Sequence, residues 1–442
     1  ALTLTVNNSN VIREAIVYLK DTQSNLSDTL KVTQYPEPKW KLNNDKLFAK
    51  YDMTELTHSF ECNIPFDVVF DEEVEWVKLK ETKSEDGQFK MVFELQPNTG
   101  EFFNRTKLRL ENEVLGLSFP LSLSQMYKTY DGHTVIWKKP TYNDPFASVP
   151  NFPRITFNFI LIGDGFTKEE IESGVYDLYC QEAMEGMESL EPFKTYSERF
   201  GFILLHAESA ESGCTDYNAT YGGPKVVDTR FKCSYDEFGT GMNCDYTAIQ
   251  EFVKTSIEGA GLDYIPTQDV VIVMANGKRY GGVANLTKSG EGVAICPVSE
   301  EPFPNNFVQI LRHEAGGHAF GKLADEYSFG GPIDASTASY LKSWQEAGMY
   351  LNVSMSSTEF PKPWQELKDR GKISDVYVGG FSCSGGVWRS SENSLMKGMD
   401  EGFNILSRYL IYLRMKNLRG EGMDFPAASL DDFLSRDKED TE

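Results

Sequence analysis

The sequence has no uninterrupted apolar run of about 18 residues, so it predicts no transmembrane segment. It is also poor in positive charge, because 43 Lys and Arg stand against 66 Asp and Glu and give a net charge of −23. A nucleic-acid-binding protein needs a basic surface to neutralise phosphates, and a protein that docks on an anionic membrane needs one as well. We therefore expect neither nucleic acid nor a membrane surface as a partner.

The sequence also has no CxxC pair. Its seven cysteines are scattered, at positions 62, 180, 214, 233, 244, 296 and 383. A cysteine-ligated zinc site is therefore not expected. Cys214, Cys233 and Cys244 lie in one turn-rich stretch and could pair in an oxidising compartment, although their spacing leaves the pairing open.

A targeting segment is missing at the start, where Ala1-Leu2-Thr3 lacks a methionine. Such a start is what removal of an upstream signal leaves, so we expect a secreted, periplasmic or cell-surface protein. What the chain does contain is 40% apolar and 13% aromatic residues, enough to bury a sizeable core.

The pattern along the chain predicts two domains. Residues 1–125 alternate apolar and polar positions, as in Met91–Leu95 and Thr106–Leu110, and indicate an all-β sandwich. Residues 126–154 carry closely spaced prolines and are expected to be a linker. Residues 155–435 alternate strand and helix patterns, typical of an α/β (α+β) domain. Residues 436–442 form a charged tail that we expect to be disordered.

Within the second domain, buried strands are predicted over 155–162, 202–205 and 269–274. A capping box at Thr167 and Glu170 predicts one long helix to about residue 188, and a further helix is predicted over 246–257. Glycines before Val293-Ala294-Ile295 suggest that this short strand lies at the sheet edge beside a cleft.

The chemistry-bearing motif is His313-Glu314-Ala315-Gly316-Gly317-His318, an HExxxH pattern after an apolar helical run. It is one residue longer than the HExxH of zinc peptidases. Residues i and i+4 lie about 40° apart around an α-helix, whereas i and i+5 lie about 140° apart. Both imidazoles can therefore reach one metal only if the helix is overwound or bulged between them. A one-residue π-bulge does this, and the paired glycines would permit it. The alternative is two ordinary helix-terminal histidines.

A third ligand is expected shortly after this helix. Gly321 follows three residues after His318, and we expect it to end the helix in a left-handed turn. The chain then returns through Asp325 and Glu326. Catalytic zinc takes three protein ligands, and a carboxylate is an accepted third. Asp325 is favoured and Glu326 remains the alternative, while an ordinary solvated acidic pair would involve no metal.

Met396 lies in Glu392-Asn393-Ser394-Leu395-Met396. A buried methionine is ordinarily a gap filler in the core. After a zinc motif, the same run is similar to the Met-turn that lies under the metal in metzincin peptidases. A closing helix over 404–413 is expected to follow.

Taken together, HEAGGHAFGKLADEY, the upstream GDGF and the downstream ENSLM resemble the M64 family of secreted bacterial metallopeptidases, whose type member is an immunoglobulin A endopeptidase. A β-rich domain before the peptidase domain is similar to the arrangement in gut Bacteroidetes members. The resemblance covers roughly residues 155–420 and implies a metzincin-like fold with Zn2+ as cofactor. The type pattern has four-residue histidine spacing, and this sequence has five.

Carried over by position, the resemblance implies that zinc is bound by His313, His318 and Asp325, with Glu314 as the catalytic base. A developing oxyanion needs a further donor, for which Tyr327 and Arg389 are candidates, although Arg389 could instead pair with a nearby carboxylate.

The leading hypothesis is thus a zinc-dependent endopeptidase that acts on extracellular protein or peptide substrates. A second hypothesis is a peptidase-like binding protein that has lost turnover through its lengthened motif. A third is a carbohydrate-binding surface protein that uses Trp40 and Trp76 of the β-domain, although isolated aromatic residues are usually part of the core.

Overall fold

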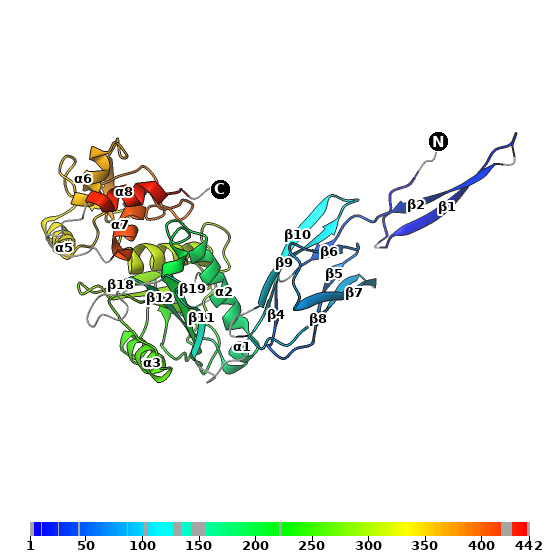
Figure 1. The fold of residues 1–442 in the computed structure, drawn as a ribbon, viewed down its shortest axis with the longest axis horizontal. Coiled ribbons are helices and arrows are strands. Elements are labelled where there is room, and N and C mark those ends of the chain that lie inside the picture. The colour runs from blue at the N-terminus through cyan, green and yellow to red at the C-terminus, as the bar shows by residue number, and fades with distance from the viewer. Residues whose placement is uncertain are drawn as a thin grey trace. The chain divides into compact units, whose positions relative to one another are not determined.

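The computed structural model describes residues 4–9, 11–24, 26–42, 45–85, 87–100, 104–126, 134–142, 155–218, 220, 223–416 and 427–439. The chain divides into two compact units, Ala1–Lys128 and Thr129–Glu442 (Figure 1). No helix among the described residues is long and apolar enough to cross a membrane.

The first unit is β-rich, as expected. One four-stranded sheet has the order β4-β10-β9-β6 and the other has the order β3-β5-β8-β7. Their strands are β3 Trp40–Lys41, β4 Lys46–Ala49, β5 Glu55–Cys62, β6 Asp67–Phe70, β7 Val77–Glu85, β8 Gln88–Leu95, β9 Asn104–Asn112 and β10 Leu117–Gln125. Side chains from both sheets share one core. In it, the ring centroids of Phe60, Phe66 and Phe89 lie 5.6 to 6.4 Å apart. The alternating pattern works because every second side chain reaches this core.

A two-stranded ribbon precedes these sheets. β1 (Arg13–Lys20) pairs with β2 (Ser27–Gln34) along all eight positions, and most of its side chains are exposed. The alternation at the start of the chain predicts a strand, but Leu4–Val6 is not one, and residues 1–3 lie outside the described range.

The second unit is built on a six-stranded sheet of order β11-β13-β12-β17-β19-β18. Its strands are β11 Thr134–Lys138, β12 Phe157–Asp164, β13 Phe200–Leu205, β17 Val270–Ala275, β18 Val283–Leu286 and β19 Gly292–Pro297. β12, β13, β17 and β19 are parallel neighbours and almost completely buried. Continuous apolar runs predict such strands, because helices cover both faces of a parallel sheet.

Two expectations about this sheet were wrong. Val293–Ile295 does not form the edge: β19 is an inner strand, and β18 pairs with it antiparallel as the edge strand. The segment expected to be a linker contributes β11, which pairs antiparallel with β13 at the other edge. A strand of five residues just before Pro140 gives too short a pattern to recognise. Residues 143–154 lie outside the described range.

Helices cover the two faces of the sheet. Isoleucines of α3 (Tyr246–Gly259) pack on one face, and Phe320 packs on Phe157 and Phe159 of the other. The capping box at Thr167 is present. The long helix predicted after it is broken, because Gly174 has φ +85° and separates α1 (Lys168–Glu172) from α2 (Val175–Glu188).

The C-terminal part of this unit is mostly helical. It contains α4 (Phe307–Leu311), α5 (Ala335–Glu346), α6 (Lys362–Asp369), α7 (Ile405–Met415), α8 (Ala427–Arg436) and a small sheet of β20 (Val353–Ser354), β22 (Cys383–Arg389) and β21 (Tyr377–Gly380). The predicted closing helix is α7, capped by Asn404. The C-terminal tail was expected to be disordered, but Asp437 forms a bidentate ion pair with the buried Arg408. Residues 440–442 lie outside the described range.

Candidate metal centre

The helix that carries HExxxH changes type within the motif. α4 continues directly into a π-helix over Arg312–Phe320. A π-helix bonds residue i to i+5, so residues five apart lie one above the other. Gly321 N–H accordingly donates to Gly316 O at 3.0 Å. The expected widening is thus confirmed, and it spans the whole motif instead of a single residue.

This wider turn brings three ligand-type side chains to one point. The Nε2 atoms of His313 and His318 lie 3.1 Å apart, and each lies 3.1 Å from Oδ1 of Asp325. Among the described residues they form the one His, Cys, Asp or Glu group arranged to hold a metal ion. The structure therefore gathers the three residues that the sequence and the resemblance single out as ligands.

The orientation of both imidazoles fits metal binding. His313 Nδ1 donates to Leu395 O at 2.9 Å and His318 Nδ1 donates to Leu323 O at 2.7 Å. A carbonyl can only accept, so each neutral ring carries its lone pair on Nε2, and three acceptors face each other. A cation resolves this arrangement. Ligand atoms about 2.0–2.1 Å from a tetrahedral zinc lie about 3.3 Å apart, close to the spacing observed.

The electrostatics of this cluster also favour a cation. Burial lowers the pKa of His318, but the carboxylate of Asp325 outweighs it and raises that pKa to about 9. Burial raises the pKa of Asp325, but the two histidines hold it well below its usual range. The Asp325 side chain remains 25% exposed, so the cluster is open to solvent on one side.

Glu314 lies beside the ligands and is only 8% exposed. Burial raises the pKa of its carboxyl, and the two histidines offset part of that effect. Gly282, just before the edge strand β18, lies directly against it: a Cβ at this glycine would be 3.0 Å from both Cγ and Oε1 of Glu314. The backbone beside the edge strand therefore forms a wall of the Glu314 site.

Glu326 faces a different environment from its neighbour Asp325. Its carboxylate is fully buried and accepts hydrogen bonds from Asn352 Nδ2 (2.9 Å), Ser394 Oγ (2.6 Å) and Asn404 Nδ2 (3.1 Å). Burial raises its pKa, while those hydrogen bonds oppose the shift. Of the two candidates for third ligand, the structure brings Asp325 to the histidines, whereas Glu326 joins the loops around them.

The turn that ends the π-helix and leads the chain back to Asp325 differs from the predicted one. Gly321 has φ −68°, and the left-handed residue is Lys322 at φ +56°. Leu323 N–H then donates to Gly317 O, six residues back, which is one residue more than in the Schellman motif of an α-helix. Nζ of Lys322 also donates to Ala319 O at 2.6 Å. Gly321 is required for another reason: its Cβ would lie 2.8 Å from Gly317 O.

Met396 lies directly beneath the motif. It is fully buried, and a Cβ on Gly317 would come within 2.3 Å of its sulfur. The Met396 carbonyl accepts from Glu326 N–H at 2.7 Å, and the preceding Leu395 carbonyl orients His313. This loop therefore orients the candidate ligand His313 and holds the backbone of Glu326, which is next to the candidate ligand Asp325.

Tyr327 and Arg389 have different placements. Tyr327 lies beside Asp325, and burial together with that carboxylate raises the pKa of the Tyr327 hydroxyl. The guanidinium of Arg389 donates to the backbone carbonyls of Val378, Gly379 and Glu392, so it joins β21 to the Met396 loop. Of the two, only Tyr327 contacts a ligand.

Sequence reasoning missed the residues that position the ligands. Asn352, Ser394 and Asn404 hold Glu326, and Leu323 and Leu395 orient the histidines through backbone carbonyls. The only signal for Asn404 in the sequence is its position before a helix, because Asn is a favoured N-cap. A backbone carbonyl carries no side-chain signal at all.

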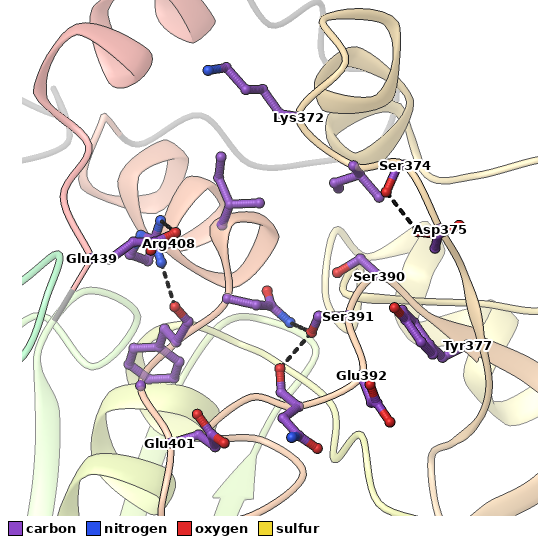
Figure 2. A pocket seen from close by; sticks show the side chains of 16 residues that line it. Lys372, Ser374, Asp375, Tyr377, Ser390, Ser391, Glu392, Glu401, Arg408 and Glu439 are labelled. Carbon is purple, nitrogen blue, oxygen red and sulfur yellow. Dashed lines mark hydrogen bonds and ion pairs between the residues drawn. The ribbon is translucent and has the colours of Figure 1, made fainter. Parts of the chain in front are cut away.

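A polar cavity of about 410 Å³ lies next to this supporting loop (Figure 2). Phe403 and Asn404 belong to its wall and also belong to the site, since Phe403 packs near Gly317 and Asn404 binds Glu326. The three ligand side chains are not among the residues that line it. The cavity is thus separated from the metal cluster by the residues that support it.

Together, a mixed α/β unit and a partly buried His-His-Asp cluster with an adjacent Glu define a candidate metal-dependent hydrolase. The model of the family described as IgA Peptidase M64 matches residues 147–372, just over half of the 442 residues, and the chain belongs to this family. The match includes the HExxxH motif and Asp325 but ends before Met396. The chain is thus a member of a metallopeptidase family.

Other comparisons add little. No curated protein sequence matches this chain. The solved structures that match include Dpr2 Ig1-Ig2 with DIP-Theta (11% identity, 26% of this chain and 41% of that chain, TM-score 0.17). An endo-fucoidan hydrolase of glycoside hydrolase family 107 is 9% identical over 26% and 22%, with a TM-score of 0.15. Titin domain M7 is 12% identical over 21% and 94%, with a TM-score of 0.15. The chain spans less than half of the first two, and similarity of this size supports no inference about function.

Proposed function

We propose that this protein is a zinc-dependent endopeptidase that hydrolyses peptide bonds of extracellular protein substrates, with zinc held by His313, His318 and Asp325. One observation carries the proposal: three ligand atoms lie 3.1 Å apart, and both imidazoles are oriented by carbonyl groups so that their lone pairs face the same point.

Glu314 is the general base in this mechanism. When bound, zinc supplies Lewis acidity that makes water more acidic and polarises the scissile carbonyl. The carboxylate of Glu314 takes the proton of the attacking water and passes it to the leaving nitrogen. Burial raises its pKa towards the working range, which favours both halves of this transfer.

The other residues hold this centre in place. Tyr327 lies beside Asp325, and its hydroxyl is the candidate donor to a developing oxyanion. Met396 forms the floor under Gly317, which supports a metzincin-like organisation of the peptidase domain, 155–435. The family description, IgA Peptidase M64, names an extracellular protein as the substrate, which supports a secreted, periplasmic or cell-surface location.

The competing function is a peptidase-like binding protein without turnover. Its motivation is the five-residue histidine spacing, which the π-helix accommodates without separating the imidazoles. The carbohydrate-binding alternative has less support, because Trp76 packs against the core of the β-domain and Trp40 packs on Phe119.

Metal analysis together with two substitutions tests the proposal. The purified chain should contain about one zinc, which His318→Ala removes together with cleavage of an unfolded protein substrate. Glu314→Gln should keep the zinc and reduce cleavage by about 10²–10⁴-fold, the usual size of a general-base contribution. A zinc-loaded wild-type protein that cleaves nothing in a broad peptide library would establish the binding-protein alternative.

A further inference from the structure

Two cysteines face each other across a short hairpin in the second unit. β15 (Ser234–Tyr235) pairs antiparallel with β16 (Met242–Asn243), with Ser234 opposite Asn243 and Tyr235 opposite Met242. Continuing this register by one residue places Cys233 opposite Cys244.

The pair occupies the closer of the two kinds of cross-strand position. Asp236 N–H donates to Gly241 O at 2.9 Å, which makes these two a hydrogen-bonded pair. Positions alternate along an antiparallel ladder, so Cys233 and Cys244 form a non-hydrogen-bonded pair, whose Cα atoms lie about 4.5 Å apart. This spacing is within the range that a disulfide bridges.

The side chains interact, as this register requires. The neighbouring Cys244 thiol and burial both raise the pKa of the Cys233 thiol. Cys233 is fully buried, whereas Cys244 is only half-buried. The third nearby thiol, Cys214, is directed to the backbone, since its Sγ donates to Cys233 O at 3.3 Å. The geometry thus distinguishes the cross-strand pair from the other two pairings.

We propose that Cys233 and Cys244 form a disulfide when the protein is in an oxidising compartment. The more accessible Cys244 thiolate attacks a small-molecule disulfide and releases one thiol. The Cys233 thiolate then attacks the mixed disulfide at the Cys244 sulfur and releases the second thiol. Two protons leave the cysteines, and the two electrons reduce the external disulfide to two thiols.

The bond would stabilise a hairpin that supports the Glu314 wall. Tyr235 packs against Gly277 and Gly281, and Gly282 N–H donates to the Thr240 carbonyl at the hairpin tip. Gly282 in turn lies against Glu314. Closing the hairpin at its base therefore fixes the segment beside the general base without touching the ligands.

Thiol counting and peptide mapping test the proposal without any activity assay. The intact chain is incubated with oxidised glutathione, denatured without reductant, alkylated and digested. Five alkylated cysteines of seven and a peptide linked through Cys233 and Cys244 are expected. Seven alkylated cysteines, or a linked peptide that contains Cys214, would overturn it.

Two variants sharpen this result. Cys214→Ser is the matched control and should give four alkylated cysteines and the same linked peptide. Cys244→Ser should give six alkylated cysteines. Oxidised wild type should melt about 5 °C higher than the reduced form, because a short loop is closed, and Cys244→Ser should show no such difference. Equal melting temperatures of the two wild-type forms would show that the hairpin gains nothing from the bond.

Discussion

Asp325 and Glu326 are adjacent carboxylates with opposite environments. Asp325 faces the Nε2 acceptor atoms of two imidazoles, with the Tyr327 side chain beside it, and keeps a quarter of its side-chain surface exposed. Glu326 is completely buried and is met by three donor side chains. A carboxylate surrounded by donors is already satisfied, whereas one surrounded by acceptors needs a cation. The comparison shows that the hydrogen-bond partners of a carboxylate, and not its acidity or its position in the sequence, distinguish a candidate metal ligand such as Asp325 from a structural residue such as Glu326.

The largest expected effect comes from neutralising the ligand. Asp325→Asn removes the negative charge and should bring zinc content close to zero, with cleavage reduced by at least about 10³-fold. Metal analysis and a peptide-cleavage assay measure both. Glu326→Gln is the matched control and should retain zinc; zinc binding by Asp325→Asn but not by Glu326→Gln would reverse the two assignments.

Removing the metal should have the next largest effect. With free zinc at about a thousand times Kd, the lost binding energy lowers stability by about 4 kcal/mol. Chelation should therefore lower the Tm of wild type and of Glu326→Gln, measured by scanning calorimetry. The Tm of Asp325→Asn should not respond, and a shift of equal size in that variant would place the metal elsewhere.

Substituting Glu326 should affect the stability of the protein more than its metal content. Glu326→Gln places an amide donor against Ser394 or Asn404 donors and should cost about 1–3 kcal/mol in urea unfolding. Burial raises the pKa of Glu326 in the folded state, so its contribution is fully present below the unfolded value near 4.5 and is lost as pH rises through the folded value. The difference between wild type and variant should therefore shrink with rising pH; a growing difference would contradict the raised pKa.

The smallest effect on stability is expected from substituting Gly317, which lies between the two histidines. Gly317→Ala brings a Cβ within 2.3 Å of the Met396 sulfur and should cost about 1 kcal/mol, after the gain in helix propensity. Gly316→Ala is the matched control, because its Cβ would meet Met187 and Phe193 at 3.3 Å, a contact that small side-chain shifts relieve. Equal thermal stability of the two variants would mean that Met396 is free to move.

The sequence predicts the parts of this fold that depend on long patterns. The strands β12, β13 and β17 and the helix α3 coincide with their apolar periods, and the need for a wider turn follows from the angle between residues five apart. It fails at the end of the π-helix. The left-handed residue is Lys322 and not Gly321, and Gly321 instead leaves space beside the Gly317 carbonyl, where a Cβ would not fit.

Strand order and the anchoring of Glu326 could not be predicted for the same reason. β18 becomes the edge because it turns back on β19, and only the assembled sheet shows it. Glu326 binds Asn352, Ser394 and Asn404, which follow it by 26, 68 and 78 positions. No local sequence pattern predicts contacts between residues that are so far apart in the chain.

The π-helix over Arg312–Phe320 also bears on how metal motifs are recognised. The number of residues between two histidine ligands is a property of the helix type, not of the metal, since an α-helix aligns residues four apart and a π-helix aligns residues five apart. A search restricted to HExxH would pass over this chain. A pattern that allows one additional residue, when small residues lie between the histidines, would recover centres of this kind.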